Sequence, residues 1–221
     1  PHDPTRVDQQ LYDDVLACIA SNVKMGPFMA TSGVELPYYL NASTNFLDKH
    51  AAPKIVQIMA QYIDQYMRPL FETTESGGSD LPFLCVGMEV AGGMLVCQLA
   101  SANSELMNSI MDFTYVRKEK KQTGTKQQLE GPQVFTSRTS ESPPLKALWV
   151  DDALSTGSSM LDGIKMLKDE YNIEVVAALY LVDRAVDRAN LSPQYLKLAD
   201  EVLDNVQVKA IYDLSEVDDA V

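Results

Sequence analysis

Two adjacent carboxylates, Asp151 and Asp152, directly follow a short apolar run, residues 147–150. Small and hydroxylated residues come next, namely Ser155, Thr156, Gly157, Ser158 and Ser159. A turn of this composition presents backbone N–H groups and hydroxyls at a helix N-terminus, where the helix dipole favours an anion such as phosphate. The carboxylates need a different partner. At the carboxyl end of a strand they can hold sugar hydroxyls or a metal-bound water.

Apolar residues on both sides of this turn predict the elements that position it. The run before Asp151 is typical of a buried strand. After the turn, Met160, Ile164, Leu167 and Tyr171 recur three or four residues apart, which predicts an amphipathic helix. The stretch therefore predicts a strand, a tight turn and a helix. An ordinary turn with a solvated aspartate pair is the alternative.

A basic stretch, RKEKKQTGTKQQLEG at residues 117–131, is the second candidate for chemistry. It holds five of the chain's 18 basic residues: Arg117, Lys118, Lys120, Lys121 and Lys126. Gly124 and the polar residues around it are incompatible with a packed core, so we expect a mobile loop. Its cations could bind an anion, and a solvated run of charge is the alternative.

A diglycine, Gly92-Gly93, follows a fully apolar run at residues 81–87 and precedes an apolar helical run at residues 94–102. Strand, glycine-bearing turn and helix form the βα unit of a parallel sheet. The diglycine would let the backbone approach a ligand and would supply amide donors for an anion. Close packing of helix against strand explains it equally well.

The remaining chain predicts further elements. Val7, Leu11, Val15 and Ile19 indicate a helix ending before Gly26, and residues 55–66 indicate another, opened by Pro53. Two short strands in residues 26–41 are expected to break at Ser32-Gly33 and at Pro37. Further strands are expected at residues 112–116, 174–183 and 206–212. Residues 132–146 are expected to form a loop without assigned function, and residues 213–221 an acidic tail.

Composition limits the class of protein. The 221 residues are enough for one sizeable core, and a net charge of −13 disfavours nucleic acid or an anionic membrane as a partner. No apolar run approaches the roughly 20 residues of a membrane span, and the opening residues lack the pattern of a signal peptide. The three cysteines have no metal or disulfide spacing. We therefore expect a cytoplasmic protein without a bound metal cluster.

From about Gly26 to Leu214 the sequence resembles the orotate phosphoribosyltransferases of the type I phosphoribosyltransferase family. The acidic pair and the T-G-S-S turn resemble the family's signature for 5-phosphoribosyl 1-pyrophosphate (PRPP). The resemblance implies that Asp151 and Asp152 are catalytic and hold the ribose hydroxyls, directly or through Mg²⁺ that arrives with PRPP. The residues it assigns to PRPP are Arg117, Lys118, Lys121, Thr123, Asp151, Asp152, Ala153, Leu154, Ser155, Thr156, Gly157, Ser158, Ser159, Val90 and Ala91.

The basic stretch is similar to the family's catalytic loop, R-K-E-x-K-x-[HY]-G-T-K-x-x-[VL]-E-G. By that similarity Arg117 and Lys118 would bind the pyrophosphate of PRPP. Lys121 would be the catalytic lysine that closes over the leaving group, in the neighbouring subunit of a homodimer. Thr123 stands where many relatives have His or Tyr.

The same resemblance assigns residues to orotate. Residues 26–41 resemble the family's hood segment, G-x-F-x-L-x-S-G-x-x-S-P-Y-Y, in which Tyr39 and Leu40 occupy the places that close over the base. Thr31 stands where many relatives have a lysine, and by the resemblance Ser155 would also contact the base. Arg184 would bind the orotate carboxylate, since a planar bidentate donor suits a planar carboxylate. A buried ion pair within Asp183-Arg184 is the alternative.

The resemblance implies an α/β fold with a mainly parallel central sheet flanked by helices and a small N-terminal hood. We expect one domain over residues 1–221, with the hood at about 22–45 and the core sheet at about 81–214. The implied reaction joins orotate to PRPP, giving orotidine 5′-monophosphate and pyrophosphate. Two alternatives remain: transfer to uracil or a purine, and a catalytically silent PRPP-binding regulator. Thr31, Ala91 and Thr123 keep the second alternative open.

Overall fold

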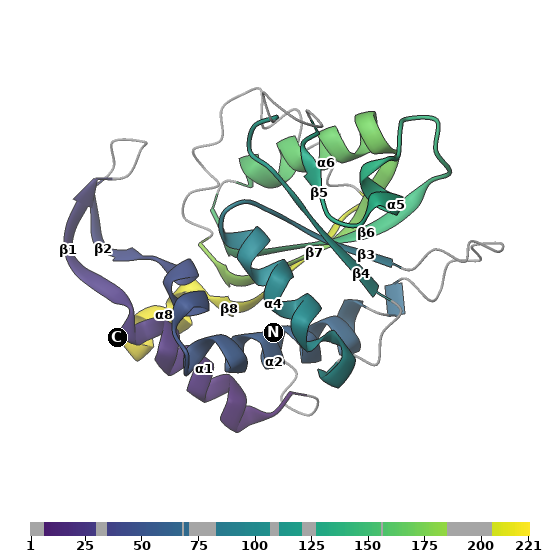
Figure 1. Ribbon diagram of the computed structural model, residues 1–221. Coiled ribbons are helices and arrows are strands. Elements are labelled where there is room, and N and C mark those ends of the chain that lie inside the picture. The colour runs from purple at the N-terminus through teal and green to yellow at the C-terminus, as the bar shows by residue number, and fades with distance from the viewer. Residues whose placement is uncertain are drawn as a thin grey trace.

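The chain forms a six-stranded sheet, helices on both of its faces and a separate two-stranded sheet, as the computed structural model in Figure 1 shows. The structure describes residues 7–29, 35–67, 69–70, 83–106, 111–120, 127–155, 157–184 and 205–221. Within these residues no helix is both long and apolar enough to cross a membrane.

The central sheet has the strand order β5-β4-β3-β6-β7-β8. Its strands are β3 (Phe83–Met88), β4 (Met111–Val116), β5 (Leu129–Glu130), β6 (Leu145–Leu154), β7 (Ile173–Asp183) and β8 (Gln207–Asp213). All neighbours pair in parallel except β4 and β5, which are antiparallel. This confirms the expected α/β class with a mainly parallel sheet.

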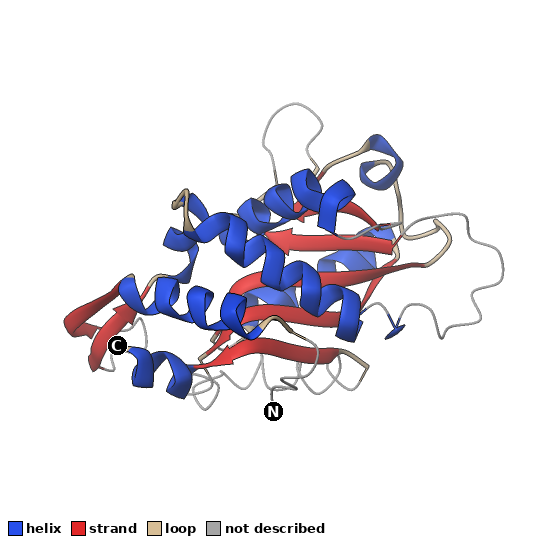
Figure 2. Cartoon of the chain, turned by 90° about the horizontal axis from the view of Figure 1, so that it is seen from below, coloured by secondary structure: helices blue, strands red, loops and turns tan. Residues whose placement is uncertain are grey.

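Helices cover the two faces of this sheet (Figures 1 and 2). On one face lie α1 (Gln9–Ser21), α2 (Ala51–Tyr62) and α4 (Ala91–Leu106), and on the other lies α6 (Ser158–Tyr171). Side chains of a strand alternate between faces. Accordingly, Leu148 and Val150 of β6 join the core under the first group of helices, whereas Trp149 packs with the residues of α6. All four residues that predicted the helix after the turn are buried in α6.

The contact between β6 and α6 requires a glycine. Trp149 is fully buried, and a Cβ atom placed on Gly163 of α6 would lie 2.4 Å from the edge of its ring. The absence of a side chain at Gly163 therefore lets the helix approach the strand that carries Asp151 and Asp152.

The two-stranded sheet consists of β1 (Val23–Met29) and β2 (Glu35–Leu40), which are antiparallel and project from the body of the molecule (Figure 1). It lies within the range expected for the hood. The sequence suggested that Pro37 breaks a strand, and this was wrong, because Pro37 lies inside β2. The register shifts between Met25 and Phe28, opposite Pro37, so the proline sits at an irregularity of the ladder where a missing N–H is tolerated. The short helix η1 (Ala42–Leu47) follows β2.

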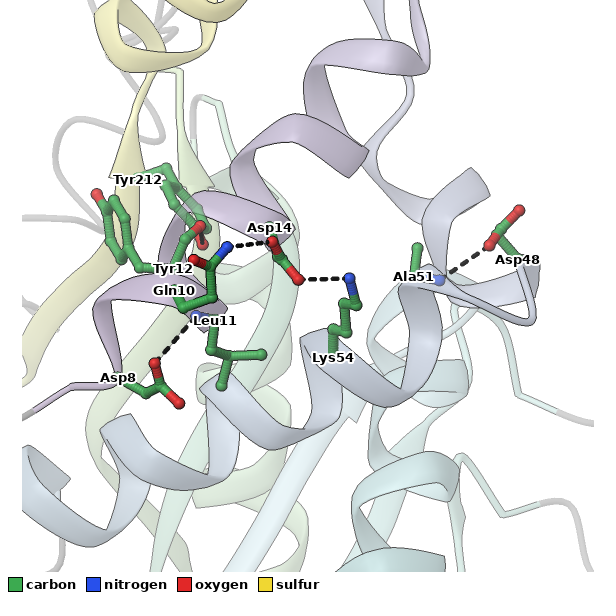
Figure 3. A network of polar contacts seen from close by, with 9 residues as sticks. All are labelled: Asp8, Gln10, Leu11, Tyr12, Asp14, Asp48, Ala51, Lys54 and Tyr212. Atoms are coloured by element: carbon green, nitrogen blue, oxygen red, sulfur yellow. Dashed lines mark hydrogen bonds and ion pairs between the residues drawn. The ribbon is translucent and has the colours of Figure 1, made fainter.

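Helix α1 is joined to α2 by the ion pair of Asp14 and Lys54 marked in Figure 3, and to β8 by Tyr12 and Tyr212, drawn in the same view. Lys54 Nζ of α2 lies 2.6 Å from Asp14 Oδ2 of α1. Next to this ion pair, the rings of Tyr12 and Tyr212 have centroids 4.5 Å apart, and the Tyr212 hydroxyl donates to the main-chain oxygen of Tyr12 at 2.9 Å. These contacts join the first helix to the last strand of the sheet.

The C-terminal residues form a helix, α8 (Leu214–Ala220), so the expected acidic tail was wrong. A capping box explains the helix: Asp213 and Glu216 each accept a backbone N–H at its first turn. Val217 is fully buried, and Glu216 also accepts a hydrogen bond from the Tyr12 hydroxyl at 2.6 Å. The distant contact with α1 stabilises a helix too short to form alone.

Residues 132–146 also differ from the expected loop. They contain the one-turn helix α5 (Gln133–Thr136) and the first two residues of β6. Phe135 is fully buried, and the Arg138 guanidinium donates to main-chain oxygens of Tyr171, at 3.1 Å, and of Pro143. This connection is therefore bound to the C-terminal end of α6, the end opposite the turn that contains Gly157.

Candidate active site

A cavity of about 240 Å³ lies where the carboxyl ends of β3 and β6 meet the N-terminus of α6. The residues that line it come from the turn after β3, the chain after β4, the end of β6, the turn that follows and β7. They are Met88, Glu89, Val90, Ala91, Lys118, Asp151, Asp152, Ala153, Leu154, Ser155, Gly157, Ser158, Ser159, Met160 and Tyr180. The fold thus brings together most of the residues that the sequence assigned to PRPP.

The acidic pair lies inside β6, which continues to Leu154 instead of ending at Val150 as the sequence suggested. Main-chain N–H groups point at both carboxylates. Asp151 accepts from the N–H of Asp152 at 3.0 Å and from the N–H of Gly92, while Asp152 accepts from the N–H of Ala153 at 2.8 Å and from the N–H of Ser43. The pair is therefore held by segments from three distant parts of the chain.

Burial raises the pKa of the Asp151 carboxyl well above its usual range, and the adjacent charge of Asp152 adds to the shift. Burial also raises the pKa of Asp152, while the N–H groups of Ala153 and Ser43 oppose that increase. A hydrogen bond joins the two side chains. Two adjacent, partly buried carboxylates favour one shared proton, which hydroxyl donors or a cation can replace on binding.

The N-terminus of α6 is suited to an anion. Its N-cap is Gly157, with a φ of 77°, a conformation that favours glycine. Glycine supplies no capping side chain, and the first turn of α6 contains no acidic residue. The positive end of the helix dipole therefore faces the cavity without a carboxylate from its own first turn. Thr156, the remaining residue of the predicted turn, lies outside the described residues.

The diglycine is explained at Gly92 by close packing. A Cβ on Gly92 would lie 2.9 Å from the main-chain oxygen of Val150 and 3.1 Å from Asp151 Oδ1. Gly87, at the end of β3, touches the same helix turn, because a Cβ there would lie 2.6 Å from the oxygen of Gly92. This packing brings the N–H of Gly92 to Asp151. The peptide bond between Glu89 and Val90, in the turn before it, is cis.

Of the predicted cations, Lys118 lines the cavity. Arg117 does not; its Nη1 lies 3.6 Å from Glu130 Oε1. Lys120 Nζ forms an ion pair with Glu170, at 2.6 Å, near the C-terminal end of α6 and about 18 Å along the helix from the cavity. Lys121 and Thr123 lie outside the described residues, so their roles stay predictions.

Of the residues assigned to orotate, Ser155 lines this cavity, whereas Arg184, Tyr39 and Leu40 do not. Arg184 follows β7, and its N–H donates to the oxygen of Leu154 at 2.7 Å, beside Ser155. Tyr39 is 41% exposed and its ring lies 5.7 Å from that of Phe28, whereas Leu40 is 4% exposed and packs in the core. Tyr39 is thus the member of that pair with surface for a ligand. Thr31 lies outside the described residues.

Two contributions to the site were missed in the sequence. Glu89 lines the cavity and accepts the main-chain N–H of Lys118 at 2.7 Å. A carboxylate in the turn before a diglycine could have been noted as a candidate. The N–H of Ser43 could not, since a main-chain donor carries no residue signal and Ser43 is distant from Asp152 in the chain.

No group of three or more metal-ligating side chains occurs among the described residues. Asp151 and Asp152 alone cannot form a protein cage for a metal. They do fit Mg²⁺, which commonly binds one or two carboxylates together with substrate phosphates and water.

Comparisons with known proteins agree with this geometry. The family described as "Phosphoribosyl transferase domain" matches residues 52–212. An orotate phosphoribosyltransferase of Bifidobacterium longum (strain DJO10A) is 32% identical over 162 residues, 73% of this chain and 64% of that protein. The Pyrococcus abyssi (strain GE5 / Orsay) enzyme of the same name is 28% identical over 82% of this chain and 85% of its own length. The crystal structure of Mycobacterium tuberculosis H37Rv orotate phosphoribosyltransferase superposes with a TM-score of 0.61 at 20% identity, covering 94% of this chain and 98% of that one.

Proposed function

Because the chain belongs to the phosphoribosyltransferase family, we propose that it transfers the 5-phosphoribosyl group of PRPP to orotate. In this reaction N1 of orotate forms a bond to C1′ of the ribose, and the bond from C1′ to the pyrophosphate oxygen breaks. The pyrophosphate leaves with the electron pair, and the N1 proton is lost. The products are orotidine 5′-monophosphate, a precursor of UMP in pyrimidine biosynthesis, and pyrophosphate.

One observation carries the proposal: a single cavity combines an acidic pair, a glycine-led helix N-terminus and a lysine. The three parts match the three parts of PRPP. The N-terminus of α6 would bind the 5′-phosphate, Asp151 and Asp152 the ribose hydroxyls, and Lys118 with the turn after β3 the pyrophosphate. Relatives named orotate phosphoribosyltransferases support orotate as the acceptor.

The residues of the cavity contribute by charge and position. Carboxylates that accept the ribose hydroxyls orient C1′ and favour positive charge as it develops on the sugar ring. Donors around the pyrophosphate stabilise the negative charge of the leaving group, and closure over the cavity would exclude water. In this proposal Lys121 supplies such closure from the partner subunit of a homodimer, and Arg117 exchanges its contact with Glu130 for one with the pyrophosphate.

Mg²⁺ would be held by Asp151 and Asp152, through water, and by the phosphates of PRPP. Bound there, it would neutralise charge on the pyrophosphate. The acceptor end of the site would be formed by Arg184, beside Leu154, and by Tyr39 of the hood. In this proposal the enzyme acts in the cytoplasm.

Parallel assays with orotate, uracil and hypoxanthine, each with PRPP and Mg²⁺, test the proposal by pyrophosphate release. Release with orotate alone is the expected result. Release with uracil or hypoxanthine but not orotate would show that the acceptor is wrong. Tight binding of PRPP without release from any base would instead favour a regulator that binds PRPP.

A further inference from the structure

Two side chains outside the proposed chemistry hold the start of the basic stretch. The segment Arg117-Lys118, here called the root, follows β4, and Lys118 lines the cavity. Glu89 approaches the root from the turn after β3, and Gln128 approaches it from the chain just before β5. Neither residue was expected from the sequence to act in PRPP binding.

Every main-chain polar group of the root has a partner. The N–H of Arg117 donates to the oxygen of Gln128 at 2.8 Å, and Gln128 Nε2 donates back to the oxygen of Arg117 at 2.8 Å. The same Nε2 lies 3.4 Å from the oxygen of Lys118, and the N–H of Lys118 donates to Glu89 Oε1 at 2.7 Å. The root is in neither a helix nor a strand, so its main-chain groups need other partners, and three of these four bonds use a side chain of Gln128 or Glu89.

Glu89 also joins the ends of two neighbouring strands. Its own N–H donates to the oxygen of Val116 at 2.8 Å, which extends the β3–β4 ladder one residue beyond the last pair, Met88 and Val116. Val90 and Ala91, which follow Glu89, line the same cavity as Lys118. One side chain thus connects the two segments that would meet the pyrophosphate.

The charge of Glu89 needs an explanation in a cavity for a polyanion, because a bare carboxylate there would repel the ligand. Its bond to Lys118 supplies one, since Oε1 accepts the main-chain N–H of Lys118 at 2.7 Å and is not left bare toward the ligand. The bond also directs the Glu89 carboxylate at the root. We therefore assign the role of Glu89 to its side-chain oxygen, which accepts the main-chain N–H of Lys118.

We propose that Glu89 and Gln128 are positioning residues for pyrophosphate binding: they hold the main chain of the root so that the Lys118 side chain faces the cavity. This inference rests on the proposed function, because it takes the pyrophosphate of PRPP as the ligand of Lys118. It assigns neither residue to a direct contact with PRPP.

Four variants test it: Glu89→Ala and Gln128→Met, which remove the acceptor and the donor, Glu89→Gln, which retains an acceptor oxygen, and Glu141→Ala as an exposed control. The measurements are the Kd of pyrophosphate by calorimetry, the KM for PRPP and kcat. We expect the Kd and KM to rise about tenfold in Glu89→Ala and Gln128→Met. We expect a smaller change in kcat, and values within about threefold of wild type for Glu89→Gln and for the control.

Hydrogen exchange of the Lys118 amide provides a readout that needs no turnover. Its protection should fall in Glu89→Ala and persist in Glu89→Gln. Unchanged protection in Glu89→Ala, wild-type pyrophosphate affinity in that variant, or an equal loss in Glu89→Gln would each overturn the inference. If the wild-type protein binds pyrophosphate but converts no orotate, the proposed function fails while the positioning role still stands or falls on these variants.

Discussion

Gly87→Ala should destabilise the protein, because the main chain at Gly87 of β3 lies in close contact with the main chains of Gly92 and Val150 and leaves no room for a side chain. The added Cβ would lie 2.6 Å from the oxygen of Gly92, 2.7 Å from its carbonyl carbon and 2.8 Å from the oxygen of Val150. All three atoms are main chain, so no side-chain rotation relieves the overlap. Overpacking of this kind costs about 1–3 kcal/mol. We expect the free energy of unfolding to fall by an amount near the upper end of that range, because the first turn of α4 must move away from β3.

Gly93→Ala is the matched control from the same turn. A Cβ on Gly93 would lie 3.5 Å from the ring of Tyr115, which is ordinary van der Waals contact. Gly93 is in α4, where alanine is more favourable than glycine by up to about 1 kcal/mol. We therefore expect Gly93→Ala to match or exceed the wild-type free energy of unfolding.

Urea unfolding followed by tryptophan fluorescence measures both variants, since the chain's one tryptophan, Trp149, is fully buried. PRPP affinity should fall at least about tenfold in Gly87→Ala, because moving Gly92 takes its N–H away from Asp151. Wild-type stability of Gly87→Ala, or an equal loss in the two variants, would refute the packing argument.

Three further predictions concern the charge of Asp151, the loop residue Lys121 and the core contact of Gly163. Asp151→Asn keeps an acceptor oxygen but removes a carboxyl whose pKa burial raises, so the wild-type protein loses stability relative to the variant as pH rises above the unfolded value of 3.8. The advantage of Asp151→Asn in free energy of unfolding, measured in urea, should grow by up to about 1.4 kcal/mol per pH unit until the pH passes the pKa of Asp151 in the folded protein. An advantage that does not change with pH would contradict this prediction. Exposed Asp219→Asn is the control. Lys121→Ala should lower kcat by roughly a hundredfold or more with an unchanged unfolding midpoint, if it stabilises the leaving group, whereas a wild-type rate would remove Lys121 from the proposal. Gly163→Ala should lower the free energy of unfolding by about 1–3 kcal/mol, since its Cβ would overlap the ring of Trp149. An unchanged thermal midpoint would contradict this, because it would show that the ring can move aside freely.

The long periodic elements could be predicted from the sequence because their own residues decide them. Met160 and Leu167 mark the buried side of α6, and the apolar run before Asp151 marks a central strand. Such patterns need no knowledge of distant contacts. The glycine-led turn then follows from the order of these elements, whereas the end of β6 was expected at Val150 and lies at Leu154.

Short elements were missed because distant residues stabilise them. The helix α8 depends on Glu216 meeting Tyr12, and the connection after α5 depends on Arg138 meeting the carbonyl of Tyr171. Leu40 shows the same limit at the site, since its place in a motif gave no sign that it packs in the core. Contacts between residues that are distant in the sequence, and not local composition, decide the structure at these residues.

Formation of orotidine 5′-monophosphate from orotate and PRPP, compared between the wild-type protein and an Asp151→Asn/Asp152→Asn double variant, tests the central claim most directly. The wild-type protein should form the nucleotide and pyrophosphate in equal amounts. Loss of two charged acceptors for the ribose hydroxyls should slow the folded double variant by roughly 10² to 10⁴. No nucleotide from the folded wild-type protein, or an unchanged rate in the double variant, would contradict the account.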